Sequence, residues 1–382
     1  MNKFVVSTLL TCCLLSTECC FSQGVDLLKD SILRKVCSLQ CRNDVFYHDG
    51  LFPSERRYEL SRLSRPDNNI FLSALVALTL EGVRDDFDDA GRLLIDSVVD
   101  QVRLNFWRYR NRNREVTYNF WQTQPDLPFP NSRYWEGKSS RRIPDDFDDT
   151  SILYLMQKNN DSLNSLVKEK MAKHAEASLG KVRSTFAKYR NYKAYPTWFG
   201  KNMKQDFDIC VMSNTLMFIF RKGLPLNQYD SATIDLMTEM VSSGEYLRHP
   251  RIVSSHYQKR SVILYHLARL LSVAPNCKLD SVRDILHLDI CRQLEKEHEP
   301  MGRVLLYSSL LRLKERPPAC FSPEDYVRDI GKFHFGVANV LSGSSRFAKR
   351  IIGSSPVPIF TYHCEAYNWA LILEMLCQAG RP

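Results

Sequence analysis

The sequence is poor in the residues and motifs that mark several common protein classes. Its 382 residues include 15 glycines and 17 prolines, too few for a collagen-like, low-complexity or disordered chain. It contains no GxSxG, P-loop, HExxH or GxGxxG pattern, which argues against the common hydrolases, nucleotide-binding enzymes and zinc proteases that depend on them. After residue 22, no run of 18 consecutive apolar residues could form a membrane-spanning helix. We therefore expect a globular protein that is soluble or peripheral to a membrane.

The cysteines lack the arrangement that binds zinc. Eight of the 12 cysteines follow residue 22, and none of these forms a CxxC pair, so a structural zinc site is not expected. Buried free thiols are the main interpretation. Disulfides are an alternative in an oxidising compartment, although Cys37 and Cys41, one helical turn apart, would bridge poorly. The eight are Cys37, Cys41, Cys210, Cys277, Cys291, Cys320, Cys364 and Cys377.

The charge balance is basic but the charges are mixed. There are 52 Lys and Arg against 43 Asp and Glu, a net charge of +9. Because the basic residues are scattered, we expect no nucleic-acid partner. The one basic string, Arg108–Arg114, is interpreted as a solvated helix end, with contact to anionic lipid or to phosphate as the alternative.

The N-terminus has the features of a secretory signal peptide. Lys3 precedes an apolar run from Phe4 to Leu15, and the small and polar residues that follow predict cleavage near Ser22. We expect a signal peptide over residues 1–22, one domain over residues 23–382, and export to the periplasm or the exterior. A lipoprotein is the weaker alternative, because the residues before Cys12 and Cys19 do not have the usual small and apolar pattern.

Helical periodicity covers most of the chain. Apolar residues recur at three- and four-residue spacing, and no convincing alternating run predicts a strand, so the expected class is all-α. Between Asn111 and Pro144, prolines and aromatic residues predict a long functional loop. The predicted helical segments are Ile70–Leu80, Leu93–Trp107, Leu163–Tyr189, Val211–Phe220, Val262–Leu271, Val304–Leu313 and Ala366–Leu376.

A polar segment leads directly into a strongly apolar helix six times, at intervals of roughly 45 to 80 residues. More amphipathic helices lie between, for example Asp88–Trp107, Ser231–Ser242 and Ser281–Glu295. Six inner helices alternating with six outer ones would close into a single (α/α)6 toroid. The inner N-termini would then open at one end and gather the polar segments there. These segments are Pro66–Asn69, Pro144–Asp149, Gln205–Asp208, Ser254–Lys259, Glu299–Arg303 and Phe360–Glu365.

The string Asp145-Asp146-Phe147-Asp148-Asp149 is the strongest chemical signal. Helix capping explains one carboxylate at a helix start but not four. Carboxylates this close should raise at least one pKa and favour a shared proton. A bound cation, Mg²⁺ above all, is the alternative, but no cofactor is our main expectation.

This string resembles the DxDDT motif of the class II terpene cyclases, which belong to the terpenoid-cyclase and prenyltransferase toroid superfamily. Asp146, Asp148, Asp149 and Thr150 match the motif. The resemblance implies that Asp148 donates a proton to an alkene or epoxide of a polyprenyl-type substrate, with Asp146 and Asp149 holding it. Such chemistry needs a buried, neutral acid that faces an apolar cavity with aromatic walls. The candidate wall residues are Trp121, Trp135, Trp198, Phe199, Tyr257 and Tyr362.

A second string, Asp85-Asp86-Phe87-Asp88-Asp89, repeats the acidic pattern. Both strings also satisfy DDxxD, the magnesium-binding pattern of class I prenyl-diphosphate enzymes, but the companion motif is missing: Asn164 and Lys168 stand where Ser and Glu are required. Because the second string precedes an outer helix, we expect it to cap that helix and to face solvent.

Two other functions use the same scaffold. A secreted carbohydrate-active hydrolase or lyase would bind a glycan in an open cleft between two carboxyl groups, Asp148 with Asp208 or Glu365. A toroid could also bind a ligand without catalysis. Besides the catalytic candidates Asp146, Asp148 and Asp149, the residues expected to bind substrate are Trp121, Trp135, Trp198, Asp208, His256, Tyr257 and Glu365.

Overall fold

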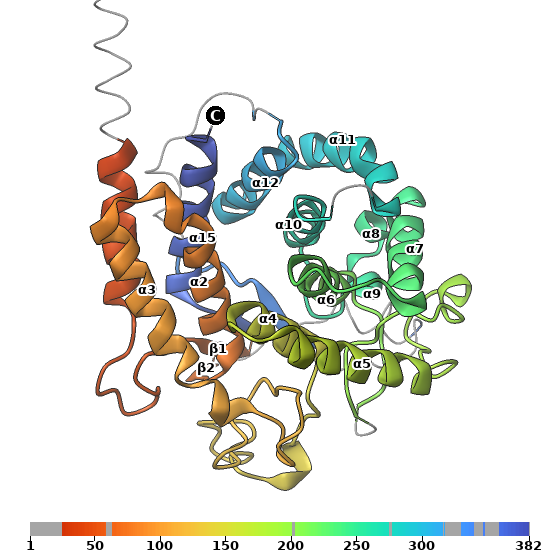
Figure 1. The fold of residues 1–382 in the computed structure, drawn as a ribbon, viewed down its shortest axis with the longest axis horizontal. Coiled ribbons are helices and arrows are strands. Elements are labelled where there is room, and N and C mark those ends of the chain that lie inside the picture. The colour runs from red at the N-terminus through yellow and green to blue at the C-terminus, as the bar shows by residue number, and fades with distance from the viewer. Residues whose placement is uncertain are drawn as a thin grey trace, which may run out of the picture.

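The computed structural model describes residues 25–58, 63–200, 203–274, 277–315, 317, 330–339, 347 and 359–381. The predicted signal peptide and Cys320 lie outside the described residues. Helices predominate in the described part, together with one small sheet (Figure 1). Among the helices described, none is long and apolar enough to cross a membrane.

Six buried helices pack in a closed sequence of neighbours. The contacts run from α2 to α4, α6, α10, α12 and α15, and α15 returns to α2 (Figure 1). These are the six strongly apolar helices expected from the sequence. Because they are apolar on nearly all sides, almost every residue in them is buried. Their bounds are α2 (Ile70–Val83), α4 (Phe147–Met156), α6 (Ile209–Arg221), α10 (Arg260–Leu271), α12 (Pro300–Arg312) and α15 (Glu365–Ala379).

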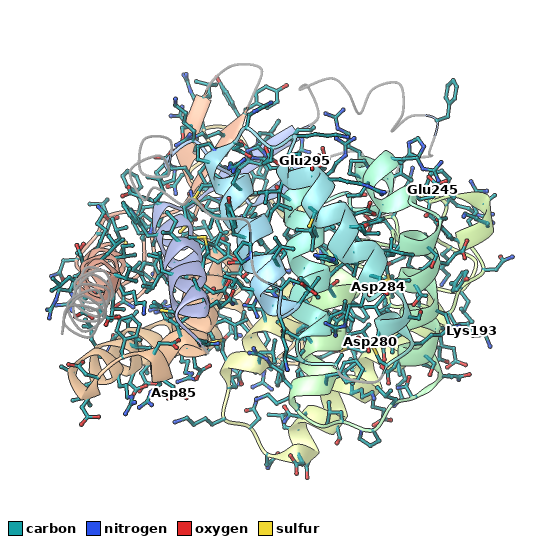
Figure 2. All side chains as sticks on the ribbon, turned by 90° about the horizontal axis from the view of Figure 1, so that it is seen from above. Asp85, Lys193, Glu245, Asp280, Asp284 and Glu295 are labelled. Atoms are coloured by element: carbon teal, nitrogen blue, oxygen red, sulfur yellow. The ribbon has the colours of Figure 1, made fainter. Side chains whose placement is uncertain are left out.

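More amphipathic helices lie outside this ring (Figure 1). In α3 (Asp89–Arg103), for example, the buried residues are Ile95, Val98, Val99 and Val102, which form one stripe against the core. At α11, Asp284 and Glu295 are exposed on the outer surface (Figure 2). The other outer elements are a helix over residues 25–38, α5 (Asp161–Ala177), α7 (Gln228–Ser242), α8 (Glu245–Arg248), α9 (Pro250–Val253) and α11 (Arg283–Leu294).

One predicted helix is too long. The segment Leu163–Tyr189 was expected to be helical throughout, but α5 ends at Ala177 and Gly180 adopts a positive φ of 70°. Glycine reaches this left-handed conformation without steric cost, so it favours termination of the helix. The short 3₁₀ helices are η1 (Arg84–Asp86), η2 (Phe106–Tyr109), η3 (Ser139–Arg141), η4 (Ala187–Tyr189) and η5 (Lys278–Val282).

The all-α prediction is wrong in one respect, because a four-stranded antiparallel sheet is present. Its order is β2-β1-β4-β3, with β1 (Glu55–Tyr58), β2 (Leu63–Pro66), β3 (Gly336–Asn339) and β4 (Ile359–His363). The strands have four or five residues, too few for a clear alternating pattern. β1 pairs with β4 from the far end of the chain, a non-local contact that no local sequence pattern reports.

The long segment between Asn111 and Pro144 is irregular as expected, with η3 as its only helix. It contributes Trp121, Phe129 and Ile143 to the cavity described below. The seven described cysteines are free thiols, and Cys41, Cys210, Cys364 and Cys377 are buried, as the interpretation as small buried residues predicts.

Candidate active site

The acidic string lies at the start of α4, and its four carboxylates have different partners. Asp146 is the N-cap, and its carboxylate accepts a hydrogen bond from the backbone N–H of Asp149 at 2.7 Å. Asp145 instead accepts hydrogen bonds from the Asn111, Thr117 and Asn119 side chains, so it anchors the long loop. Asp148 and Asp149 occupy the first turn of the helix and are both buried.

Asp148 accepts hydrogen bonds from two residues that are distant in the chain. Its Oδ2 accepts a hydrogen bond from the Tyr257 hydroxyl, and its Oδ1 accepts one from the Asn214 side-chain amide. The Asn214 carbonyl in turn accepts a hydrogen bond from Arg269. Burial raises the pKa of Asp148 from 3.8 to about 6, against the opposing effect of the Tyr257 and Asn214 hydrogen bonds. The carboxyl is therefore partly protonated near pH 6.

Asp146 and Asp149 form a coupled acid pair. Burial raises the pKa of both carboxyls, and the neighbouring Asp146 charge raises that of Asp149 further. The raised pKa values of both carboxyls favour a proton shared between them. The Oδ1 atom of Asp149 is buried and has no hydrogen-bond partner in the described part of the chain.

These acids border a cavity of about 360 Å³, within the usual range for small-molecule sites. Most of its wall is apolar. Apart from the polar atoms of tyrosine and tryptophan side chains, the polar residues of the wall are those of the acidic string, Thr197, His256 and a rim at Ser140, Arg141 and Arg142. The aromatic residues of the wall are Phe71, Phe120, Trp121, Phe129, Trp198, Tyr257, Phe360 and Tyr362, and the aliphatic ones are Leu72, Ile143, Met203, Val211, Val337 and Ala338.

The starts of several buried helices meet at this cavity. Phe71 is at the start of α2, Val211 near the start of α6, and Tyr257 directly before α10. The strand before α15 contributes Phe360 and Tyr362. The segment Glu299–Arg303 at the start of α12 is not among the residues that line the cavity. Of the six predicted polar segments, three contribute residues to the cavity wall: Pro144–Asp149, Ser254–Lys259 and Phe360–Glu365.

Seven of the ten predicted site residues line this cavity: Asp146, Asp148, Asp149, Trp121, Trp198, His256 and Tyr257. His256 Nε2 lies 3.4 Å from Oδ2 of the fully buried Asp206, and its ring meets Trp198 edge-on at 5.5 Å. The buried indole nitrogen of Trp198 has no hydrogen-bond partner within the described ranges. It can therefore donate to a polar group of a ligand.

The other three predicted residues do not reach the cavity. Asp208 is fully buried, but it caps α6 and accepts hydrogen bonds from the Ser254 hydroxyl and the His256 backbone N–H, both at 2.8 Å. Glu365 pairs with Lys35 at 3.1 Å and is about half exposed. Trp135 is 38% exposed and packs edge-on against Phe129. The expectation that these residues face the cavity is therefore corrected.

The pairs expected for glycan hydrolysis, Asp148 with Asp208 or Glu365, do not face each other across this cavity. That chemistry requires two carboxyl groups that face each other across the bound sugar. Asp208 is committed to backbone and hydroxyl donors, and Glu365 lies outside the cavity in a surface ion pair. Neither residue lines the cavity beside Asp148.

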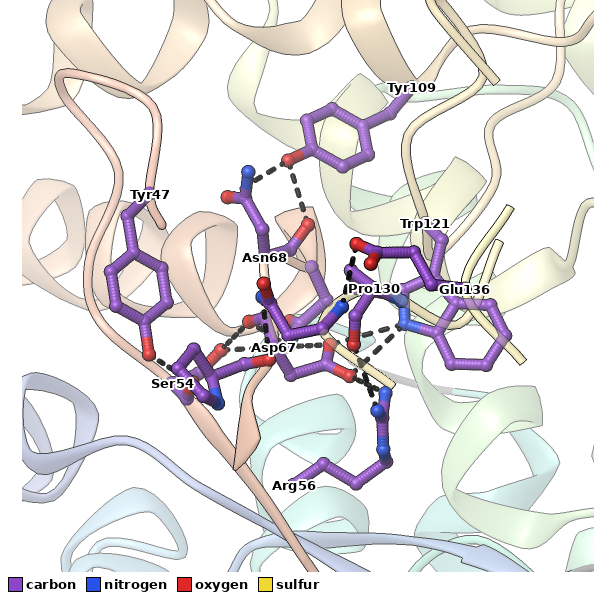
Figure 3. Close-up of polar contacts among 12 residues, drawn as sticks. Tyr47, Ser54, Arg56, Asp67, Asn68, Tyr109, Trp121, Pro130 and Glu136 are labelled. Carbon is purple, nitrogen blue, oxygen red and sulfur yellow. Dashed lines mark hydrogen bonds and ion pairs between the residues drawn. The ribbon is translucent and has the colours of Figure 1, made fainter. Parts of the chain in front are cut away.

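A buried ion pair supports the wall of the cavity next to Trp121. Arg56 of β1 pairs with Asp67, and the exposed fractions of these side chains are 3% and 0% (Figure 3). The Trp121 indole donates to both oxygens of Asp67, at 3.1 and 3.3 Å. Arg56 also lies over the Phe129 ring at 4.0 Å and donates to the Pro130 carbonyl. The pair thus ties the sheet to the long loop.

Sequence reasoning missed Asn214, Arg269 and Arg56. Asn214 and Arg269 are polar residues within strongly apolar helices, and both are buried. A buried polar group needs a partner, so a polar residue in such a helix is the signal that could have found them. Arg56 gave no such signal, because its strand is short and polar.

The second acidic string behaves as expected. Asp88 caps α3 by accepting from the Gly91 backbone N–H at 2.8 Å. Asp85 and Asp89 are 92% and 96% exposed. In the described part of the chain, no group of three or more His, Cys, Asp or Glu is arranged to hold a metal ion. Magnesium at the first string remains a hypothesis.

The raised pKa of Asp148 predicts a pH-dependent stability. The folded state binds this proton more tightly than the unfolded state, so the stabilisation is fully present below about pH 4 and is lost as pH rises to about 6. The loss is about 3 kcal/mol for a difference of about two pH units. Urea unfolding at pH 4 to 7 should show this change in the wild type relative to Asp148→Asn. A constant difference between the two proteins over that range would contradict the expected pKa.

Comparison with known proteins gives no match. No family model matches the chain, and no match is found among curated proteins or solved structures. The functional proposal below therefore starts from the chemistry of the cavity and its acids.

Proposed function

We propose that this protein is an enzyme that protonates an alkene or epoxide of a hydrophobic, polyprenyl-type substrate, as class II terpene cyclases do. The observation that carries the proposal is the position of Asp148, a buried acid with a pKa of about 6 at the wall of a mainly aromatic cavity. A carboxyl group can protonate a weakly basic double bond only if it carries a proton and lies in a site that excludes water. The apolar wall suits a substrate without charged groups near the reacting carbon.

Each group then has a defined role. The O–H bond of Asp148 breaks, and the π electrons of the alkene form the new C–H bond, which leaves a cation on the neighbouring carbon. Ring closure moves the cation, and the final cation loses a proton or captures water. The faces of Phe71, Trp121 and Trp198 stabilise positive charge. Tyr257 and Asn214 bind the Asp148 carboxylate until it regains a proton from solvent.

The proposal includes the (α/α)6 toroid as the scaffold. It is supported by the closed sequence of contacts among α2, α4, α6, α10, α12 and α15, and by amphipathic helices outside them (Figure 1). In a toroid of this kind the inner helices start at one end. This placement accounts for the acids of α4 meeting Tyr257, which directly precedes α10, in one cavity.

The test is turnover in heavy water. Purified full-length protein is incubated with a panel of linear polyprenyl alkenes and epoxides, and products are identified by gas chromatography and mass spectrometry. We expect a cyclic product that carries deuterium at the protonated carbon, because the acidic proton of Asp148 exchanges with solvent. Conversion without deuterium at that carbon, or turnover of glycans only, would show that the proposal is wrong.

A further inference from the structure

A second cavity lies near the C-terminal ends of five of the six buried helices. It has a volume of about 80 Å³ and is formed near the C-terminal ends of α2, α6, α10, α12 and α15. Four arginines and one glutamate contribute to it. The residues that line it are Leu78, Thr79, Gly82, Met217, Arg221, Arg269, Arg312, Glu374, Gln378 and Arg381.

The one carboxylate of this cavity, that of Glu374, is already bound by protein groups. Glu374 accepts hydrogen bonds from Arg312 through Oε1 and from the Tyr265 hydroxyl through Oε2. Arg381 pairs with Asp86 outside the cavity, at 2.7 Å. One carboxylate therefore faces the positive charges of Arg221, Arg269 and Arg312, and Arg221 forms no ion pair with any other residue that the structure describes.

Donors in the cavity wall also lack acceptors. The Nε atoms of Arg269 and Arg312 are buried and have no hydrogen-bond partner in the described chain. Arg269 is only 4% exposed, and one of its terminal nitrogens is already used by Asn214. Buried donors of this kind normally have a partner, and in an enclosed cationic space the fitting partner is an anion.

Compensation of the helix dipoles does not by itself account for this cluster of arginines. A cation near the last turn of a helix compensates the helix dipole, and this explains Arg221, Arg269 and Arg312 one at a time. It does not explain why the three helices direct these groups to one cavity, where the like charges repel each other. Two of these arginines differ in solvent exposure. Arg269 is buried, whereas Arg221, which also lines the cavity, is exposed.

We propose that this cavity binds a small inorganic oxyanion of the phosphate or sulfate type. Guanidinium groups bind such oxyanions through paired, charge-assisted hydrogen bonds. At about 80 Å³ the space is smaller than a cavity that admits benzene, so a nucleotide or another organic phosphate does not fit inside. Arg269 contributes to this site and also donates to Asn214 beside Asp148, but the proposed anion site does not depend on the proposed catalytic function.

Thermal unfolding and calorimetry of the full-length protein test this site. Sodium phosphate and sodium sulfate are compared with sodium chloride at equal ionic strength. We expect the two oxyanions to raise Tm by about 4 °C when they are in hundredfold excess over Kd, because a ligand that binds only the folded state stabilises it. No rise beyond that in chloride would overturn the proposal.

Arg221→Gln is the decisive variant, because among the described residues Arg221 has no ion pair to lose and makes no hydrogen bond to Asp148, Asn214 or Tyr257. Phosphate binding measured by calorimetry should weaken about 30-fold, while Tm in phosphate-free buffer should not fall, since like-charge repulsion is relieved. The control Arg292→Gln changes a side chain that is 69% exposed and does not line this cavity. Equal binding by Arg221→Gln and the wild type would place the oxyanion elsewhere and refute the site.

Discussion

Replacement of Asp148 by Asn is expected to reduce turnover of the polyprenyl substrate by about 10³-fold, while substrate binding changes little. The amide has nearly the same shape as the carboxyl and keeps one oxygen that accepts a hydrogen bond. It cannot donate an acidic proton. The aromatic wall, which supplies most of the contact with an apolar substrate, is untouched. Product formation is measured by mass spectrometry, and binding by quenching of tryptophan fluorescence, since Trp121 and Trp198 line the cavity.

The chain provides a matched control for this variant in its other acidic string. Asp88 occupies the same place in Asp85-Asp86-Phe87-Asp88-Asp89 as Asp148 does in its own string. Asp88→Asn should leave both turnover and stability unchanged, because asparagine caps a helix about as well as aspartate. If Asp148→Asn kept its activity, or if both variants lost activity equally, Asp148 would not be the proton donor.

Replacement of Arg56 by Met is expected to lower the free energy of unfolding by about 3 to 5 kcal/mol. The variant leaves the carboxylate of Asp67 buried without its cation, although the Trp121 indole still donates to it. The contact with Phe129 and the hydrogen bond to Pro130 are lost as well. The free energy of unfolding is measured by urea denaturation, with ligand binding as a second measurement, because the loop that holds Trp121 and Phe129 should loosen.

Two further variants separate the buried charge from general loss of packing. Arg292→Met removes the 69% exposed arginine of an ion pair with Asp289 and should change stability by no more than about 0.5 kcal/mol. Adding Asp67→Asn to Arg56→Met should recover much of the lost stability, because no unpaired carboxylate then remains buried. A double variant as unstable as Arg56→Met alone would attribute the loss to packing instead of charge.

Much of the helical framework could be predicted from local sequence. The six buried helices are apolar on all sides, and each follows a polar segment that includes capping residues such as Asn69, Asp146 and Asp208. These signals are local, since a cap satisfies backbone groups within the same turn. The sheet left no comparable signal, because β1 and β4 are short and their pairing joins Arg56 to Tyr362 across most of the chain.

The candidate site was predictable in part for the same reason. Its acids and Tyr257 stand in the polar segments that precede the helices, and these segments meet at the cavity. Glu365 stands in an equivalent segment, but it is on the side of α15 that faces Lys35 of the first helix. A helix rotation of this kind depends on packing between helices, which a sequence pattern does not fix.

The two acidic strings show most clearly what local sequence determines and what tertiary structure determines. Local sequence determined that both begin helices, and the amphipathic or apolar residues that follow indicated which helix is outer and which is buried. Only the tertiary structure decided that the cap is Asp88 in one string and Asp146 in the other, which leaves Asp148 inside the first turn. The pKa of Asp148 is raised because its carboxyl is buried, next to Asn214 of α6 and Tyr257. Burial is a property of neighbours distant in the chain, so identical strings acquire different chemistry.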